Sequence, residues 1–165
     1  MQAMDRIEAI FVALGKKRMP ARTGQRQVDG AKVYVKVGYY SFDDVVSVAF
    51  DQVRRAAFTS GQIAVLERLL EILERAIQAN GVPERQRSLW ARAFTVARLA
   101  PEQVSDPEDA ANFVRKAVGV GARLLGTDLR AQVAFELKEV ADLADGLRGG
   151  GRVREAVDAA LGQLN

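Results

Sequence analysis

The chain has 165 residues, of which 48% are hydrophobic and 27% are charged, so it is long enough to form one globular domain with its own core. It contains neither cysteine nor histidine. This excludes disulfides, thiolate nucleophiles, cysteine or histidine metal ligands, and histidine as a general base. No apolar run approaches the roughly 18 residues of a membrane span, and the N-terminus lacks the apolar region of a signal peptide.

The net charge of +3 is unevenly distributed along the chain. The segment from Lys16 to Lys36 has seven cations and one acid, so its charge is +6 and that of the remaining chain is −3. This pattern is typical either of a surface that binds an anionic partner or of a solvated segment kept soluble by its lysines. The cations that the first interpretation assigns to an anionic surface are Lys16, Lys17, Arg18, Arg22, Lys32 and Lys36.

The N-terminal part is predicted to form a helix and then a β-hairpin. Apolar residues recur at helical spacing over residues 3–14, and Gly15 is placed to end that helix. The hairpin is predicted near residues 26–37, because Asp29-Gly30 favours a two-residue turn and valines alternate with polar residues after it. An isolated hairpin is marginally stable in water. We therefore expect it to lie on the helices, or to pair with another copy or with further chain.

The next helix has a clear start signal at Ser41. Its hydroxyl can accept a bond from the first turn, and the carboxylate of Asp44 can bond back to the Ser41 backbone, which is the pattern of a capping box. The helix is predicted to end near residue 58. Thr59 and Gln62 resemble a second capping box, which would start the following helix.

The helix predicted over residues 61–80 has the strongest apolar stripe of the chain. The stripe either packs in the core or forms a coiled-coil seam with a second copy. Core packing is favoured, because two heptads are too few for a sustained coiled coil. The residues of the stripe, and of self-association in the second interpretation, are Ile63, Leu66, Leu70, Leu73 and Ile77.

Proline and glycine divide the C-terminal half into further helices. Pro83 opens one helix, Pro101 is predicted to separate it from the next, and Asp106 is predicted to cap that next helix. Small residues around Gly121 would let another helix approach closely. The three glycines 149–151 are predicted to form a flexible joint before a short terminal helix.

These elements predict a mostly α fold, a helical bundle of antiparallel helix hairpins with one small β-hairpin after the first helix. Residues 1–148 are predicted to form a single helical domain, and residues 149–165 the glycine-rich joint and terminal helix. No phosphate-binding glycine motif is complete, and the sequence predicts no cofactor and no metal.

Two other classes of function stay open. Glu67, Glu71 and Glu74 share a helix face and are the main candidates for carboxylate-based catalysis or ligand binding, although capping and ion pairing are the commoner roles of such acids. Nucleic-acid binding is disfavoured, because aromatic residues do not alternate with the basic ones. It would use the basic segment together with Arg85, Arg87, Arg92 and Arg98.

Two sequence blocks carry a family resemblance, QAMDRIEAI at Gln2–Ile10 and SFDDVVSVAFDQVRR at Ser41–Arg55. With the hairpin between them, residues 1–77 resemble the soluble C-terminal part of a bacterial membrane-protein family known as domain of unknown function 2254. In that family the soluble part follows several transmembrane helices. The resemblance implies a place beside the cell membrane, on its cytoplasmic side, and implies no catalytic residues.

The leading hypothesis is therefore a non-enzymatic, membrane-proximal interaction or assembly domain. Its expected partners are an anionic membrane surface, through the basic segment, and further copies of the chain.

Overall fold

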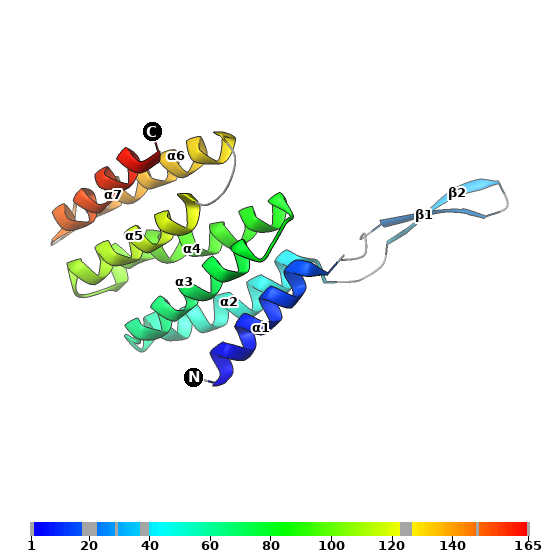
Figure 1. Ribbon diagram of the computed structural model, residues 1–165, viewed down its shortest axis with the longest axis horizontal. Coiled ribbons are helices and arrows are strands. Elements are labelled where there is room, and N and C mark those ends of the chain that lie inside the picture. Colours follow the sequence, from blue (N-terminus) through cyan, green and yellow to red (C-terminus); the bar gives the residue numbers. More distant parts are fainter. Residues whose placement is uncertain are drawn as a thin grey trace.

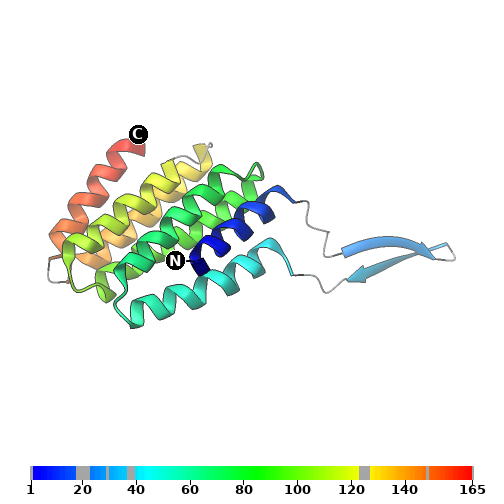
Figure 2. The same ribbon diagram turned by 60° about the horizontal axis from the view of Figure 1, so that its bottom comes forward.

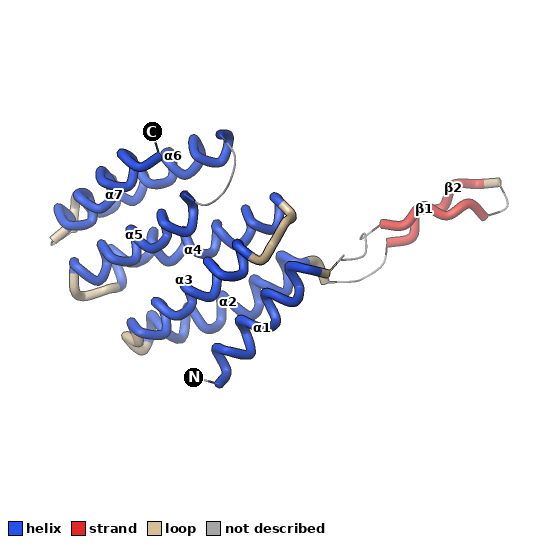
Figure 3. The backbone as a smooth tube through the Cα atoms, in the orientation of Figure 1, coloured by secondary structure: helices blue, strands red, loops and turns tan. Residues whose placement is uncertain are grey.

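The computed structural model describes residues 2–17, 23–28, 30–36, 40–122, 127–147 and 149–164. Within these ranges the chain forms seven helices and two strands (Figures 1 and 3), which confirms the mostly helical class. None of the described helices is both long and apolar enough to cross a bilayer. The elements in chain order are α1 (Gln2–Lys16), β1 (Thr23–Val28), β2 (Ala31–Lys36), α2 (Phe42–Thr59), α3 (Ile63–Gln78), α4 (Pro83–Gln103), α5 (Pro107–Ala122), α6 (Thr127–Ala144) and α7 (Gly150–Leu164).

The helices alternate between two layers (Figures 1 and 2). In one layer α1, α3, α5 and α7 contact one another in that order, and in the other layer α2, α4 and α6 do so. Each helix also contacts the next helix along the chain, which lies in the opposite layer. This is the contact pattern of an array of stacked helix pairs, in which each unit packs mainly on its neighbours.

The apolar stripe of α3 lies in the middle of the core. Leu66, Leu70, Leu73 and Ile77 are at most 2% exposed, and Ile63 is partly buried against the same core. Core packing is thus confirmed for this stripe. The interpretation of the stripe as a self-association surface is wrong, because helices of the same chain already cover these side chains.

The packing of the core explains why residue 121 is a glycine. Trp90 of α4 is 1% exposed and stacks on Phe94, with 5.4 Å between the ring centroids. A Cβ at Gly121 would lie only 2.5 Å from Nε1 of Trp90, so the close contact between α4 and α5 requires glycine there. Gly119 is exposed, and a Cβ there would have no such neighbour within 4 Å.

Two predicted helix starts are confirmed. The hydroxyl of Ser41 accepts a bond from the Asp44 N–H at 3.1 Å, and the Asp44 carboxylate accepts one from the Ser41 N–H at 2.7 Å. The Asp106 carboxylate likewise accepts a bond from the N–H of Glu108 at 2.8 Å, and Pro107 is the first residue of α5.

The second capping box is wrong. Thr59 still belongs to α2, and α3 begins after Gln62 without a side-chain cap. The backbone closes this turn instead, because the N–H of Gln62 bonds to the carbonyl oxygen of Ala57 at 2.9 Å. Gly61 supplies the left-handed conformation of the turn, with φ of 65°.

Two breaks in the C-terminal half also differ from expectation. Pro101 lies inside α4, which continues to Gln103. Because proline has no N–H, the helix lacks the bond that residue 101 would otherwise donate to the carbonyl four residues earlier. Gly150 and Gly151 already belong to α7, so the joint is shorter than predicted. A Cβ at Gly150 would lie 1.8 Å from the carbonyl oxygen of Ala144, so this glycine permits a tight connection before α7 packs on α5 and α6.

The two strands form an antiparallel pair that stands apart from the helices. Thr23 pairs with Lys36 at one end, Val28 pairs with Ala31 at the other, and Gly30 has the positive φ of a tight turn at 78°. Asp29, the other half of the predicted turn, lies outside the described residues. We call β1 and β2 together the arm.

The arm extends away from both helical layers (Figures 1 and 2). Its strands contact each other, and no substantial contact joins them to a described helix. The expectation that the hairpin lies on the helices is therefore wrong. Pairing with another copy or with further chain stays a prediction.

Candidate functional site

A single arginine contacts both roots of the arm, which are the C-terminus of α1 and the N-terminus of α2. Nη1 of Arg85 donates to the carbonyl oxygens of Leu14 at 3.0 Å, Gly15 at 3.2 Å and Lys17 at 2.8 Å. Its guanidinium also lies 5.3 Å from the centre of the Phe42 ring, a cation–π contact. A cation is favourable at a helix C-terminus, where the last carbonyls lack helical partners. Arg85 therefore fixes the point at which the arm leaves the helices.

The cations predicted to contact an anionic surface lie at both ends of the arm. Lys16 and Lys17 are exposed at its root, and Lys32 is exposed beside its tip. Lys36 is the last residue of β2, next to the root. Two of the predicted cations, Arg18 and Arg22, lie outside the described residues.

The arginines of α4 do not form one basic face. Arg85 is engaged at the root of the arm, and Arg92 forms an ion pair with Asp43 of α2 at 3.0 Å. Arg87 is exposed, and Arg98 lies beside carboxylates in a groove described below. Two of the four arginines that the nucleic-acid hypothesis requires are therefore engaged in contacts within the chain.

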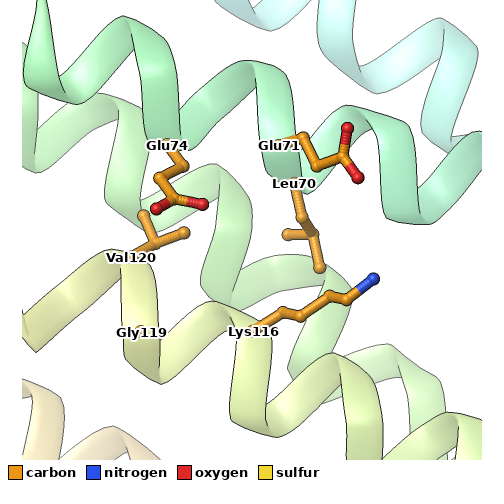
Figure 4. A pocket seen from close by; sticks show the side chains of 6 residues that line it. All are labelled: Leu70, Glu71, Glu74, Lys116, Gly119 and Val120. Atoms are coloured by element: carbon orange, nitrogen blue, oxygen red, sulfur yellow. The ribbon is translucent and has the colours of Figure 1, made fainter.

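The predicted carboxylate face lies in a groove between α3 and α5 (Figure 4). Glu71 and Glu74 come from α3 and Lys116 from α5, while Leu70 and Val120 supply apolar walls. The groove has a volume of about 200 Å³. It is thus smaller than the roughly 300–1,000 Å³ of a usual small-molecule site.

Each of these acids has a partner of its own. Glu67 forms an ion pair with Lys116 at 2.7 Å, Glu71 forms one with Arg68 at 2.9 Å, and Glu74 accepts a bond from Gln78 at 3.4 Å. Across the described residues, no group of three or more acids is arranged to hold a metal ion. The arrangement therefore supports ion pairing between helices better than it supports catalysis.

Arg68 belongs to a charge network that fastens α1 to α3. It contacts Asp5 at 3.1 Å and Glu8 at 2.8 Å in addition to Glu71, and Arg75 contacts Glu8 at 2.9 Å. The hydrogen bonds to Glu71 and then Asp5 raise the pKa of Arg68 above its ordinary value, so it stays charged. Since α1 carries one root of the arm, this network also supports the arm.

A second groove, between α4 and α6, was missed by the sequence reasoning. It consists of two adjoining hollows with volumes of about 460 and 430 Å³. Buried Phe94 lines the first hollow together with Phe135, which is 66% exposed, and Leu143, which is 41% exposed, lines the second. The sequence pattern could have indicated this groove, because Phe135 and Leu143 are apolar but do not belong to the buried stripe of α6. That stripe consists of Val133, Leu137, Val140 and Ala144.

Charged residues border the α4–α6 groove. Three carboxylates from α6 face a single guanidinium from α4, so the groove is acidic. The charged residues are Arg98, Glu136, Glu139 and Asp142.

Comparisons with protein-family models, with curated proteins and with solved structures give no match to this chain.

Proposed function

We propose that the chain is a membrane-proximal interaction and assembly domain, whose helical layers hold a basic arm against anionic lipid head groups. The observation that carries this proposal is the arm itself, which extends away from the helices and has exposed cations at its root and beside its tip. The place at the cytoplasmic side of the cell membrane is proposed from the family resemblance of residues 1–77. The helical part is proposed to be built from antiparallel helix hairpins.

The length of the arm supports an electrostatic role. A six-residue strand spans about 20 Å, which is more than twice the screening length of about 8 Å at physiological salt. The tip is therefore screened from the carboxylates of the helices, which belong to the part of the chain with a charge of −3. Cations placed in this way can approach a negative surface without the acidic helices opposing them.

Contacts at the base of the arm also fix the position at which its cations leave the helical layers. Arg85 fixes both roots, and the Arg68 network fixes α1. A cation near a membrane surface contributes about 1 kcal/mol of binding free energy, so several cations held together give measurable binding at low salt.

Vesicle binding tests the proposal. The chain is expected to bind vesicles rich in phosphatidylserine, to bind neutral phosphatidylcholine vesicles far more weakly, and to dissociate as salt rises. Changing Lys16, Lys17 and Arg18 together to Gln should cost about 3 kcal/mol, on the order of a hundredfold in partitioning.

The matched control removes three exposed cations elsewhere, Arg6, Lys138 and Arg152, by the same change to Gln. This control should keep most of the binding, because these residues lie outside the basic segment. Equal binding to neutral vesicles, or an equal loss in both triple variants, would contradict the proposal. Tighter binding to duplex DNA than to anionic vesicles at the same salt would favour the nucleic-acid alternative instead.

A further inference from the structure

We propose that Arg85 and Lys17 form a binding site for a phosphate group at the root of the arm. The site rests on the proposed function where a lipid is its source of phosphate, because it then names the part of the head group that the chain recognises. The sequence reasoning assigned Arg85 only to a nucleic-acid surface. The structure instead places it against the residues that begin the basic segment.

Arg85 is a partly buried cation without a carboxylate partner. The described residues contain three other partly buried arginines, and each of these has a carboxylate oxygen at 3.7, 2.8 or 3.0 Å, in the order Arg54, Arg68 and Arg92. Arg85 forms no ion pair with any described residue. Since a charge withdrawn from water is ordinarily paired, an anion from outside the chain would complete this position.

The guanidinium of Arg85 has one occupied edge and one open edge. Nη1 makes all the hydrogen bonds to carbonyl oxygens at the end of α1, and the Phe42 ring lies against the group. Nε and Nη2 bond to no described residue, and neither is a buried atom without a partner, so both are open to solvent. These two N–H groups form a fork that can bind two oxygens of one phosphate.

The contacts of Arg85 with its own chain hold this fork in place before an anion arrives. Three hydrogen bonds of 2.8 to 3.2 Å and the cation–π contact restrain a side chain that would otherwise sample many rotamers. Binding to a restrained group loses less side-chain entropy than binding to a mobile one. The site is therefore preorganised for an anion.

Lys17 supplies a second cation beside the fork. Its carbonyl oxygen accepts a bond from Arg85 at 2.8 Å, and its side chain is exposed, so its ammonium group can reach an anion held by Arg85. Lys16, also exposed, adds a third positive charge nearby. A phosphomonoester carries a charge of about −1.5 to −2 at neutral pH and has three strong acceptor oxygens. This charge and geometry suit the site better than a single carboxylate does.

Titration with inorganic phosphate tests the site directly. We expect the Nε–H signal of Arg85 in nitrogen-15 NMR spectra of the full chain to shift saturably as phosphate replaces chloride at constant ionic strength and pH. Arg87, which is exposed on the same helix, is the internal control and should not shift in this way.

A second pair of variants leaves the hydrogen bonds of Arg85 in place. Lys17→Gln should weaken phosphate binding about threefold or more, because it removes a cation and keeps the backbone carbonyl that Arg85 contacts. Lys138→Gln removes one exposed cation from α6 and should leave the affinity unchanged. Circular dichroism melting should show that both variants fold, since both positions are exposed.

Vesicles of equal surface charge distinguish a lipid head group from a soluble phosphate as the source. Phosphatidic acid presents a phosphomonoester, so the chain should bind these vesicles about threefold or more tighter than phosphatidylserine vesicles. Arg85→Lys should remove this preference, because lysine keeps the charge without the fork. A saturable shift of Arg85 without a lipid preference would support the site and identify soluble phosphates as its ligands.

Three outcomes would overturn the site. These are an Arg85 signal that does not shift, an equal shift of Arg87, which would indicate an adventitious ion only, and an equal loss of affinity in Lys17→Gln and Lys138→Gln. Binding to phosphatidylserine vesicles without a shift of Arg85 would leave the proposed function standing and remove the site. A saturable shift without binding to any anionic vesicle would do the reverse.

Discussion

The helical layers enclose a continuous core of buried apolar side chains, whereas the arm is a two-stranded sheet on which no described helix packs substantially. Leu66 and Leu73 in α3 have no exposed surface, while Gly30, Ala31 and Lys32 at the tip of the arm are all exposed. A two-stranded sheet gains too little from its own contacts to be stable alone. The difference indicates that the stability of the fold resides in the helices.

Truncating a core side chain should destabilise the helical layers strongly. Leu73→Ala is expected to lower the free energy of unfolding by about 2–5 kcal/mol, because it leaves a cavity where α3 meets its neighbours. Denaturant titration followed by circular dichroism measures the loss. A change below about 1 kcal/mol would show that the core around α3 is loosely packed and that the contrast with the arm is overstated.

Two glycines of α5 should respond in opposite ways to substitution by alanine. Gly121→Ala should destabilise the chain by about 1–3 kcal/mol, because the new Cβ would overlap Trp90. Gly119→Ala is the matched control and should stabilise it by about 0.5–1 kcal/mol, since alanine favours helix and meets open space there. Thermal melting of the two variants should give shifts of opposite sign, and equal shifts would contradict the close contact.

Removing the cap at the second root of the arm should have a smaller effect. Ser41→Ala is expected to cost about 1 kcal/mol, because the N–H of Asp44 loses its acceptor at the start of α2. The denaturation midpoint reports this loss. An unchanged midpoint would mean that the start of α2 contributes little to the stability of the helical layers.

Deleting the arm should have the smallest effect of all. Replacement of residues 23–36 by a short Gly-Ser linker is expected to change the free energy of unfolding by no more than about 0.5 kcal/mol, since no helix packs on the arm. The same variant keeps Lys16, Lys17 and Arg18 but lacks Lys32 and Lys36, so it should bind anionic vesicles more weakly than the full chain. A large fall in stability would show that the arm supports the helices after all.

The sequence predicts those features that depend on one helix or one turn. The stripe of α3, the capping box of Ser41 and the turn at Gly30 all rest on residues within a few positions of each other, and all are present. These features can be predicted because they depend on local hydrogen bonds and on helical spacing, and neither requires knowledge of contacts with distant parts of the chain.

Contacts between helices could not be predicted in the same way. The spacing of Glu71 and Arg75 favours a pair on one helix, yet Arg75 contacts Glu8 and Glu71 contacts Arg68. Arg85 contacts carbonyls about seventy positions earlier in the chain, and no local pattern indicates this. The α4–α6 groove likewise exists only once those two helices are neighbours.

The order of the helices in the array also has a kinetic consequence. Every substantial helix contact joins neighbours or next-but-one helices along the chain, so the helices can pack in chain order without first bringing the two ends of the chain together. α1 ends the array and contacts only α2 and α3 to that extent, so its amides should exchange with solvent sooner than those of α4 or α5. Because one root of the arm is the C-terminus of α1, each local opening of α1 would release that root from Arg85 and let the arm move through a wider volume around the helices.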